Sequence, residues 1–518
     1  MDTTPQSVAD VRSPEPLVLL GIAFLATCLS FWFAGSTYSG GIDEGIYLEG
    51  GRRVAAGQQP FRDFVIFCGP LTVWLQALAF KALGVELWVA RLWLVLDLTV
   101  LTVAVYSICR ITLARLWAAG ISFLWLFLAI DSPAKLNVNH RWDSAAFAVV
   151  AIALVARSYR SPHGPAVCLA AGVFAALAAW ATPSVGVVGL ALLGWLLWFE
   201  RRPAVAFLAG AALCSLVVLA ELAAGGALQP MVGQYRWIWT NYRQPNALPY
   251  GATITLPADG GPVSGWKLLY RVVENIYWRI SPALPPLGVP AVLLLFWRKR
   301  CTPDERKLYS LLAACSVALV VSAYPRWSAG YLIYVSAVPW ALFFVLLFRS
   351  GTHAWIRWTG VAVLVFAIGL GAFTAGLGSL RLQPIPSFAG RLEGTEEQAR
   401  FLAWLENSIE PGETLAVLPY MPSINFYTGT TSPMRHLFLQ PGMSTAEDEA
   451  QVIRDLSRNP PAKIVWQEMP PEAVLLMWPR TDVSRIGFPR LESWIRENYE
   501  PAGANSSTNG VFRLWRRR

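Results

Sequence analysis

Long apolar runs separated by short basic connectors constrain the fold of this chain more than any other feature of its sequence. A helix needs roughly 20 residues to cross a bilayer, and eleven runs come near that length. The chain of 518 residues is only 14% charged, against about 25% in an average soluble domain. The sequence therefore predicts an all-α polytopic membrane domain. Its spanning helices are expected at residues 17–35, 87–109, 113–131, 142–157, 165–182, 184–199, 204–225, 281–297, 308–324, 328–348 and 358–377.

Basic residues are concentrated in alternate connectors between these runs, and they set the expected orientation. Loops rich in Lys and Arg stay on the cytoplasmic side, which places the N-terminus in the cytoplasm. Eleven crossings then put the C-terminus outside the cell (inner or plasma) membrane. The net charge of +9 comes mostly from these loops, so it does not indicate a nucleic-acid partner. The connectors contain Arg110 and Arg115, Arg157 and Arg160, Arg201 and Arg202, Arg298 to Lys307, and Arg349 and Arg357.

The composition changes near residue 380, after the last apolar run. From there on charges occur throughout, "ETLAVLP" and "AKIVWQE" are typical of buried strands, and "EDEAQVIRDLSRN" is typical of an exposed amphipathic helix. We therefore expect two domains. Residues 1–379 form the transmembrane domain, and residues 380–518 form a soluble, extracytoplasmic α/β domain.

The first outer loop, residues 36–86, is expected to contain two helices. One covers 44–56, with Asp43 at its N-cap position. The other covers 69–84, with proline at its first position and Gly84 at its end. This second helix is amphipathic and too short to span, so we expect it to lie in the membrane interface. A further amphipathic face is expected at 269–280, in the outer loop 226–280.

Asp43 and Glu44 form an acidic pair at the outer end of the first apolar run. In one interpretation Asp43 caps the following helix and Glu44 interacts favourably with the helix dipole. In the other, the pair supplies a general base or a metal ligand at the membrane surface. Spacing alone favours the cap, because a lone acidic pair is a weak motif.

Two more clusters lie on the same outer side. His140, Arg141 and Asp143 in "NVNHRWDS" could bind a cation or an acidic substrate, or could form a loop in which Asp143 caps the next helix; the spacing does not decide. Arg326 and Tyr331 in "YPRWSAGYLIY" follow a tight outer turn. An arginine there needs an anionic partner, and arginine suits bidentate phosphate binding. We favour that function over snorkelling to the interface.

Other patterns carry less information about chemistry. The neighbours Arg62 and Asp63 are typical of a structural pair, and we favour that interpretation while keeping Arg62 as a candidate for acceptor or donor binding. The seven cysteines show no CxxC pairing, so no disulfide framework or zinc site is indicated. Walker, HExxH and GxSxG motifs do not occur.

The stretch 38–95 resembles the C-type (GT-C) glycosyltransferases, in particular the branch of protein O-mannosyltransferases and the lipid A aminoarabinose transferase. That branch has an Asp-Glu motif in its first outer loop, followed by a Pro-aromatic-Arg-Asp turn and a proline helix start. Here these are Asp43-Glu44, residues 60–63 and Gly69-Pro70. Beyond residue 95 the helix count and the outer C-terminal domain agree with the family.

The resemblance implies an inverting enzyme that takes a sugar from a dolichyl- or polyprenyl-phosphate donor at the outer face. The acceptor is then a glycan, lipid or protein. Asp43 would match the carboxylate that activates the acceptor, supported by Glu44, and Arg326 would match the residue on the donor phosphate, with Tyr331 beside it. His140, Arg141, Asp143 and Arg62 become candidates for substrate contacts. No metal is carried over, although a divalent cation is a candidate cofactor.

Two other classes of function compete with this enzyme. A lipid or solute carrier should show repeated halves, broken helices or ionisable residues at mid-membrane, whereas the sequence shows no repeat and its ionisable residues cluster at the outer ends. A surface protein could bind glycan through its C-terminal domain and use the rest as an anchor. Eleven spans are excessive for an anchor.

Overall fold

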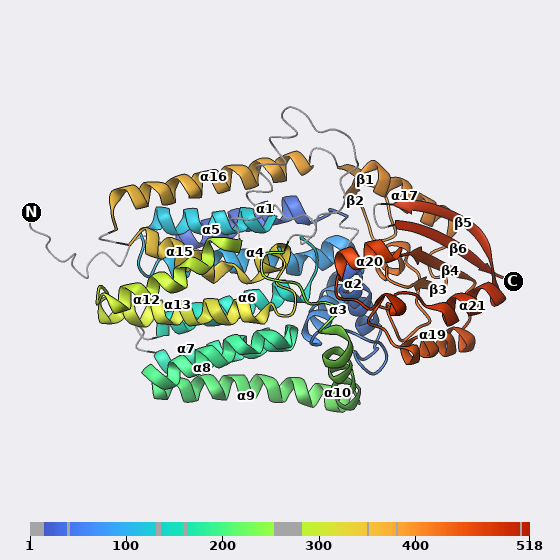
Figure 1. The fold of residues 1–518 in the computed structure, drawn as a ribbon, viewed down its shortest axis with the longest axis horizontal. Helices are drawn as coiled ribbons and strands as arrows, with labels where there is room; N and C mark the ends of the chain where they lie inside the picture. Colours follow the sequence, from blue (N-terminus) through green and yellow to red (C-terminus); the bar gives the residue numbers. More distant parts are fainter. Residues whose placement is uncertain are drawn as a thin grey trace, which may run out of the picture.

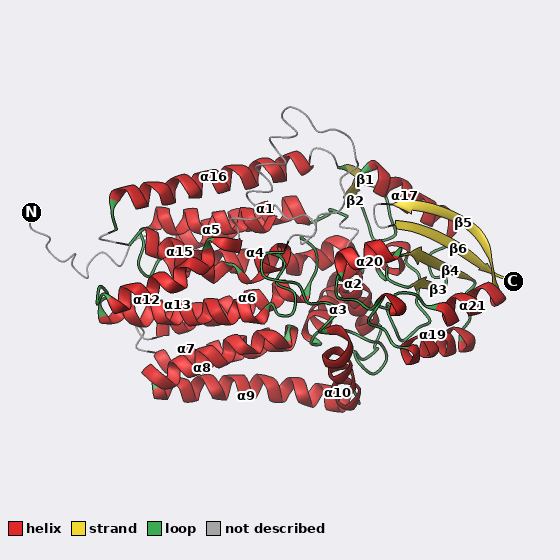
Figure 2. Cartoon of the chain, viewed as in Figure 1, coloured by secondary structure: helices red, strands yellow, loops and turns green. Residues whose placement is uncertain are grey.

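The computed structural model describes residues 15–38, 42–130, 136–158, 163–252, 282–349, 352–379, 382–507 and 510–518. A bundle of long helices forms one end of the molecule and an α/β domain forms the other (Figure 1). The strands all lie in the second part, as the colouring in Figure 2 makes plain. A mostly helical chain with a small C-terminal sheet is therefore confirmed.

Each expected apolar run coincides with helical structure, or with part of it. Among the described residues, five helices are long and apolar enough to cross a membrane, or six if a bent pair counts as one span. The number of eleven crossings therefore stays a prediction. The helices are α1 (Glu15–Ala34), α4 (Leu87–Cys109), α5 (Arg115–Ile130), α6 (His140–Ser158), α7 (Gly164–Ala181), η2 (Pro183–Val185), α8 (Gly186–Phe199), α9 (Arg201–Ala224), η4 (Pro285–Leu287), α12 (Gly288–Trp297), α13 (Pro303–Ser322), α15 (Ala337–Leu347) and α16 (Ala354–Ser379).

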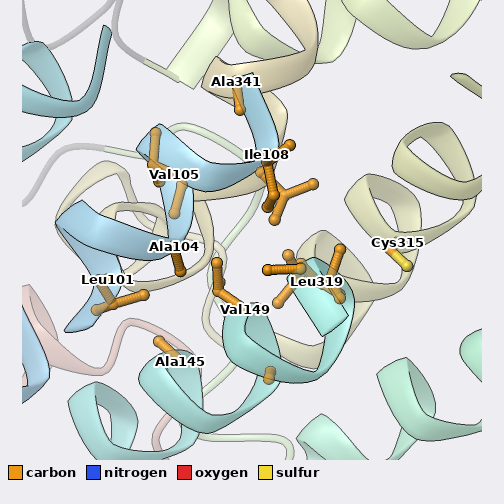
Figure 3. Packing of buried hydrophobic residues seen from close by; sticks show 14 of the residues in the cluster. Leu101, Ala104, Val105, Ile108, Ala145, Val149, Cys315, Leu319 and Ala341 are labelled. Atoms are coloured by element: carbon orange, nitrogen blue, oxygen red, sulfur yellow. The ribbon is translucent and has the colours of Figure 1, made fainter. Parts of the chain in front are cut away.

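Side chains of α4, α6, α13 and α15 meet in the buried region drawn in Figure 3, where the labelled residues are mostly aliphatic or small. Helices α7 and α9 approach even more closely, because a Cβ on Gly172 would lie 1.9 Å from the carbonyl oxygen of Phe207. Such close packing of small residues is a usual way for membrane helices to associate.

The run 328–348 is broken, so the single helix predicted there is wrong. Helix α14 (Ala329–Leu332) and the turn η5 (Ile333–Val335) are bent by 75° from α15. Backbone hydrogen bonds fix the entry to this segment: Leu248 N donates to Pro325 O at 3.0 Å, and Ala329 N donates to Ala252 O at 2.8 Å. The bend itself lies at Ser336, between η5 and α15. Pro339 is in the first turn of α15, where its missing N–H suits the start of a helix and not its interior.

Both helices predicted in the first outer loop are present, as α2 (Ile42–Ala55) and α3 (Leu71–Leu83). They lie between the bundle and the α/β domain (Figure 1). Leu78, on the predicted amphipathic face of α3, is 61% exposed, whereas Val73 and Phe80 are buried. Helix α10 (Leu228–Trp237) and the π-turn η3 (Ile238–Tyr242) were not predicted, and the expected face at 269–280 lies outside the described residues.

The C-terminal part contains a four-stranded sheet of order β3-β4-β6-β5. The two predicted buried strands are β3 and β4, which are parallel, while β6 is antiparallel to both of its neighbours. The predicted amphipathic helix is α19. The elements are β1 (Gln383–Ile385), β2 (Leu392–Gly394), α17 (Glu396–Ser408), β3 (Leu415–Leu418), α18 (Ser423–Thr428), α19 (Ala446–Arg458), β4 (Lys463–Glu468), α20 (Pro471–Met477), η6 (Val483–Arg485), α21 (Pro489–Asn498), β5 (Tyr499–Ser507) and β6 (Gly510–Arg517).

The α/β domain is firmly docked on the first outer loop. One hydrophobic cluster contains buried residues of both, including Phe64 and Phe426. Arg53 of α2 donates hydrogen bonds to the carbonyl oxygens of Met434 at 2.9 Å and Ser432 at 3.1 Å. A Cβ added to Gly45 would lie 2.3 Å from the backbone nitrogen of Ser423, at the start of α18. The α/β domain therefore lies directly against the acidic turn at Asp43.

Candidate active site

Asp43 lies in the first turn of α2, one residue after the helix begins at Ile42. The N-cap position predicted for it is therefore wrong, because the helix starts earlier than its apolar pattern indicated. A carboxylate in the first turn is stabilised by the helix dipole. The side chain is half-buried, and Oδ2 accepts a hydrogen bond from the hydroxyl of Tyr331 at 3.4 Å.

Tyr331 lies at the centre of the site. The guanidinium carbon of Arg141 is 4.7 Å from the centroid of its ring, and that of Arg326 is 5.2 Å from it. The structure thus brings Asp43, Arg141, Arg326 and Tyr331 together from segments almost 300 residues apart. In the described part of the chain, neither arginine forms an ion pair with a carboxylate.

Arg326 is buried, with 6% of its surface exposed. Its Nη1 donates a hydrogen bond to Asn246 Oδ1 at 2.9 Å, and its Nε is buried with no hydrogen-bond partner among the described residues. A buried guanidinium normally pairs with an anion. The side chain therefore has donors left for a ligand of negative charge.

Aromatic rings surround the acid and the arginines. Phe67 lies 5.3 Å from Tyr242 and 4.5 Å from Phe438, and Phe438 lies 5.7 Å from Tyr420. Burial, followed by the nearby charge of Asp43, raises the pKa of the Tyr242 and Tyr420 hydroxyls. Tyr420 belongs to the α/β domain, so that domain contributes directly to the site. Sequence reasoning missed these rings, because lone aromatic residues give no local signal of a site.

Glu44 points to a different neighbourhood from Asp43. It is completely buried, and its Oε1 is 2.7 Å from Arg91 Nε in α4. Arg91 Nη2 donates to Oε2 at 2.9 Å, and the backbone nitrogen of Val138 donates to Oε1 at 3.0 Å. These bonds occupy both carboxylate oxygens, so Glu44 anchors α2 to α4 rather than facing a substrate.

His140 and Asp143 are held in packing arrangements. The His140 Nδ1 lies 2.6 Å from the Thr182 hydroxyl. Asp143 accepts a hydrogen bond from Thr72 and is hydrogen-bonded to Asp97. Helix α6 begins at His140, so Asp143 lies inside the helix and is not its cap. Of the "NHRWD" cluster, Arg141 is the member that reaches the ring of Tyr331.

Arg62 lies apart from this group and makes structural contacts. Its Nη2 is 2.7 Å from Asp63 Oδ2, and its Nη1 donates to the carbonyl oxygen of Gly225 at 2.8 Å. It thereby ties the first outer loop to the end of α9. These contacts support the structural interpretation of the pair.

The residues of the site do not form a recognisable metal centre. Over the described ranges, no three His, Cys, Asp or Glu side chains are grouped so that they could hold an ion. The oxygens of Glu44 are taken by Arg91 and Val138. Among the described residues beside the two arginines, Asp43 is then the carboxylate left to a cation.

Known structures with the same fold are membrane enzymes. ArnT from Cupriavidus metallidurans, solved bound to undecaprenyl phosphate, matches with a TM-score of 0.56 at 14% identity, over 96% of this chain and 97% of that one. The oligosaccharyltransferase AglB from Archaeoglobus fulgidus, solved with an inhibitory peptide and a dolichol-phosphate, matches with a TM-score of 0.51 at 12% identity, over 96% of this chain and 74% of that one. No family model and no curated sequence matches.

Because these sequence identities are low, the structural similarity establishes the fold and does not identify a particular reaction. It extends over nearly the whole chain, including the C-terminal α/β domain. The resemblance of residues 38–95 had implied this architecture. The chain has the fold of the C-type glycosyltransferases.

Proposed function

We propose that the chain is a membrane glycosyltransferase that moves a sugar from a polyprenyl-phosphate donor to an acceptor at the outer face of the membrane. One observation carries the proposal. Two arginines without carboxylate partners among the described residues, Arg141 and Arg326, flank a tyrosine that is hydrogen-bonded to Asp43. We assign the two arginines to the donor phosphate and Asp43 to the base, because displacement of a sugar from phosphate requires that pairing.

In the proposed reaction Asp43 removes the proton from the acceptor hydroxyl or amine. The acceptor atom forms a bond to the anomeric carbon, and the bond from that carbon to the phosphate oxygen breaks. The electron pair leaves with the lipid phosphate, whose added negative charge Arg326 and Arg141 stabilise. Attack opposite the leaving group inverts the anomeric configuration.

Tyr331 has a positioning role in this scheme. Its hydroxyl lies 3.4 Å from the Asp43 carboxylate and its ring lies against both guanidinium groups, so the proposed base and phosphate site adjoin the same side chain. Because the charged groups are fixed before the substrate arrives, little reorganisation is needed in the transition state. Glu44 contributes indirectly by holding α2 through Arg91.

Solved structures with the same fold support a lipid-linked donor. ArnT was solved with undecaprenyl phosphate and AglB with a dolichol-phosphate. For this chain we propose a ligand of the same class. The sugar and the acceptor, whether glycan, lipid or protein, are left to experiment.

The test is transfer by the purified protein from a panel of radiolabelled polyprenyl-phosphate hexoses and pentoses, with an outer-envelope extract as the acceptor. We expect one donor to be consumed, with release of polyprenyl phosphate. In parallel, a deletion strain should accumulate that donor and lack a surface glycan. Failure of the folded protein to consume any donor, combined with unchanged lipid intermediates in the deletion strain, would contradict the proposal.

A further inference from the structure

A cavity lies in the α/β domain, away from the residues around Asp43. Its volume is about 660 Å³, within the range of roughly 300–1,000 Å³ that is usual for small-molecule sites. The floor is formed by β4 and β6, and α21 supplies one wall. The lining residues used below are Trp466, Glu468, Glu492, Arg496, Arg513 and Trp515.

Two tryptophans share the floor of this cleft. Trp466 of β4 pairs directly with Arg513 of β6, and Trp515 is two residues further along β6. Residues two apart on a strand face the same side, and diagonal neighbours are close enough for large side chains to meet. The indole Nε1 of Trp515 is buried and has no hydrogen-bond partner in the described part of the chain. The floor thus offers two broad apolar faces, while the Nε1 donor of Trp515 lies beneath the surface.

The charges in the cleft are balanced. Glu468 forms an ion pair with Arg513, and Glu492 lies 3.6 Å from Arg496. Two carboxylates and two guanidinium groups give no net charge, so neither a phosphate nor a basic ligand is favoured. Their exposed edges still supply several hydrogen-bond donors and acceptors.

We propose that this cleft binds an uncharged oligosaccharide, as a glycan-binding site separate from the site at Asp43. A sugar ring has an apolar C–H face, which packs on an indole, and vicinal hydroxyls, which pair with carboxylates and guanidinium groups. A peptide is the weaker candidate. Extended peptides are usually recognised by pairing with a sheet edge, whereas this cleft lies on the face of β4 and β6.

The cleft is connected to the candidate active site by a short piece of chain. Pro419 lines the cleft, and the next residue, Tyr420, is buried in the aromatic wall beside Asp43. This arrangement suits a glycan acceptor that is held in the cleft while one of its ends extends to the site at Asp43. The role as an acceptor rests on the proposed function, whereas the binding of glycan in the cleft does not.

The test is binding of neutral hexasaccharides to the full-length protein in detergent, without any donor. The probes are arabinan, mannan, galactan and cellulose oligosaccharides, and saturation-transfer NMR reports the bound rings. We expect one class to bind, and Trp466→Ala to weaken it by about tenfold, as loss of one aromatic contact would. Because that change could disturb the fold, the Glu468→Gln/Arg513→Gln variant, which keeps the charge balance and the side-chain size, should also weaken binding.

The matched control is Glu396→Gln/Arg400→Gln, which removes an exposed ion pair of α17 outside the cleft. It should leave binding unchanged. Absence of binding by every hexasaccharide, binding by both cleft variants as tight as that of the wild type, or binding of an uncharged peptide in place of a sugar would each overturn the proposal. Binding without donor consumption would instead contradict the proposed transfer reaction and leave the cleft assignment standing.

Discussion

Glu44 Oε1 lies 2.7 Å from Arg91 Nε, deep between α2 and α4, while the adjacent Asp43 faces Tyr331 at the edge of the site. Successive residues of a helix point about 100° apart, so two neighbouring carboxylates can have unrelated tasks. The structure assigns an internal ion pair to one and leaves the other half-buried. Five predictions follow from this and the related contacts.

Asp43→Asn should lower transfer from the lipid-linked donor by about a hundredfold or more, because an amide cannot accept the acceptor's proton. The side chain is close to isosteric and can still accept the hydrogen bond from Tyr331, so thermal stability should change little. The measurement is donor turnover by purified protein at matched concentrations. Wild-type turnover would leave the proposed enzyme without its base.

Glu44→Gln should act mainly on stability. It leaves the buried guanidinium of Arg91 uncompensated, a change that typically costs about 3–5 kcal/mol. A double variant, Glu44→Gln with Arg91→Met, should unfold at a higher temperature than Glu44→Gln alone, because the orphaned charge is gone. Thermal unfolding in detergent measures both. The turnover of Glu44→Gln per folded molecule should stay above the turnover of Asp43→Asn. If Glu44→Gln were the slower of the two, Glu44 would be the better candidate for the base.

Arg326→Ala should reduce turnover by about a hundredfold or more, the loss typical of one electrostatic group in an active site. Arg326→Lys should restore little, because a point charge cannot reproduce a bidentate contact to phosphate. Arg62→Ala serves as the comparison, since among the described residues that arginine contacts Asp63 and the carbonyl of Gly225, away from Tyr331. The phosphate assignment fails if Arg326→Ala and Arg62→Ala lower turnover equally.

Gly45→Ala should loosen the α/β domain. Alanine inside a helix normally stabilises it by about 1 kcal/mol relative to glycine, but here the new Cβ would lie 2.3 Å from the Ser423 backbone. Limited proteolysis should therefore release the C-terminal fragment faster, and turnover should fall. The control is Gly233→Ala in α10, where a Cβ meets nothing within 4 Å. It should change neither the rate of proteolysis nor the turnover. Identical digestion of the two variants would show that the contact is not tight.

The α/β domain is expected outside the cytoplasm. It lies at the opposite end of the bundle from the start of α1 (Figure 1), where Glu15 pairs with Arg110 and Arg115 of a basic connector. A phosphatase that is active only outside, fused after Arg518, should therefore be active. Activity of a reporter that works only in the cytoplasm, fused at the same position, would contradict the predicted orientation and the outer-face position of the proposed donor.

The periodicity of apolar residues was enough to predict the helices of the bundle, the two helices of the first outer loop and the strands β3 and β4. It failed at 328–348, where the helix is interrupted at Ser336 and bent by 75°. Hydrogen bonds with Leu248 and Ala252 hold the stretch just before Tyr331. Long-range bonds of this kind leave no periodic trace in either segment.

For the candidate site, the chemical properties of single residues were more informative than the periodicity of apolar residues. The need of an arginine in an outer turn for an anion predicted a role for Arg326, and the structure brings Arg326 and Tyr331 of that stretch close to Asp43; the phosphate role itself stays a prediction. The separate tasks of Asp43 and Glu44 could not be predicted, because they depend on where Arg91 of α4 lies. Tyr242 and Tyr420 were missed for a similar reason, since each is an ordinary aromatic residue until folding places it beside the carboxylate.

The contribution of Tyr420 to the wall around Asp43 also bears on how the protein matures. Ribosomes release chains from the N-terminus, so Asp43 emerges long before Tyr420 and the β3–α18 segment that covers it. The acidic turn is therefore incomplete until the α/β domain has been made and has packed against α2. Under the proposed function, a truncated or stalled product that lacks this domain would have an incomplete site and would not consume the donor.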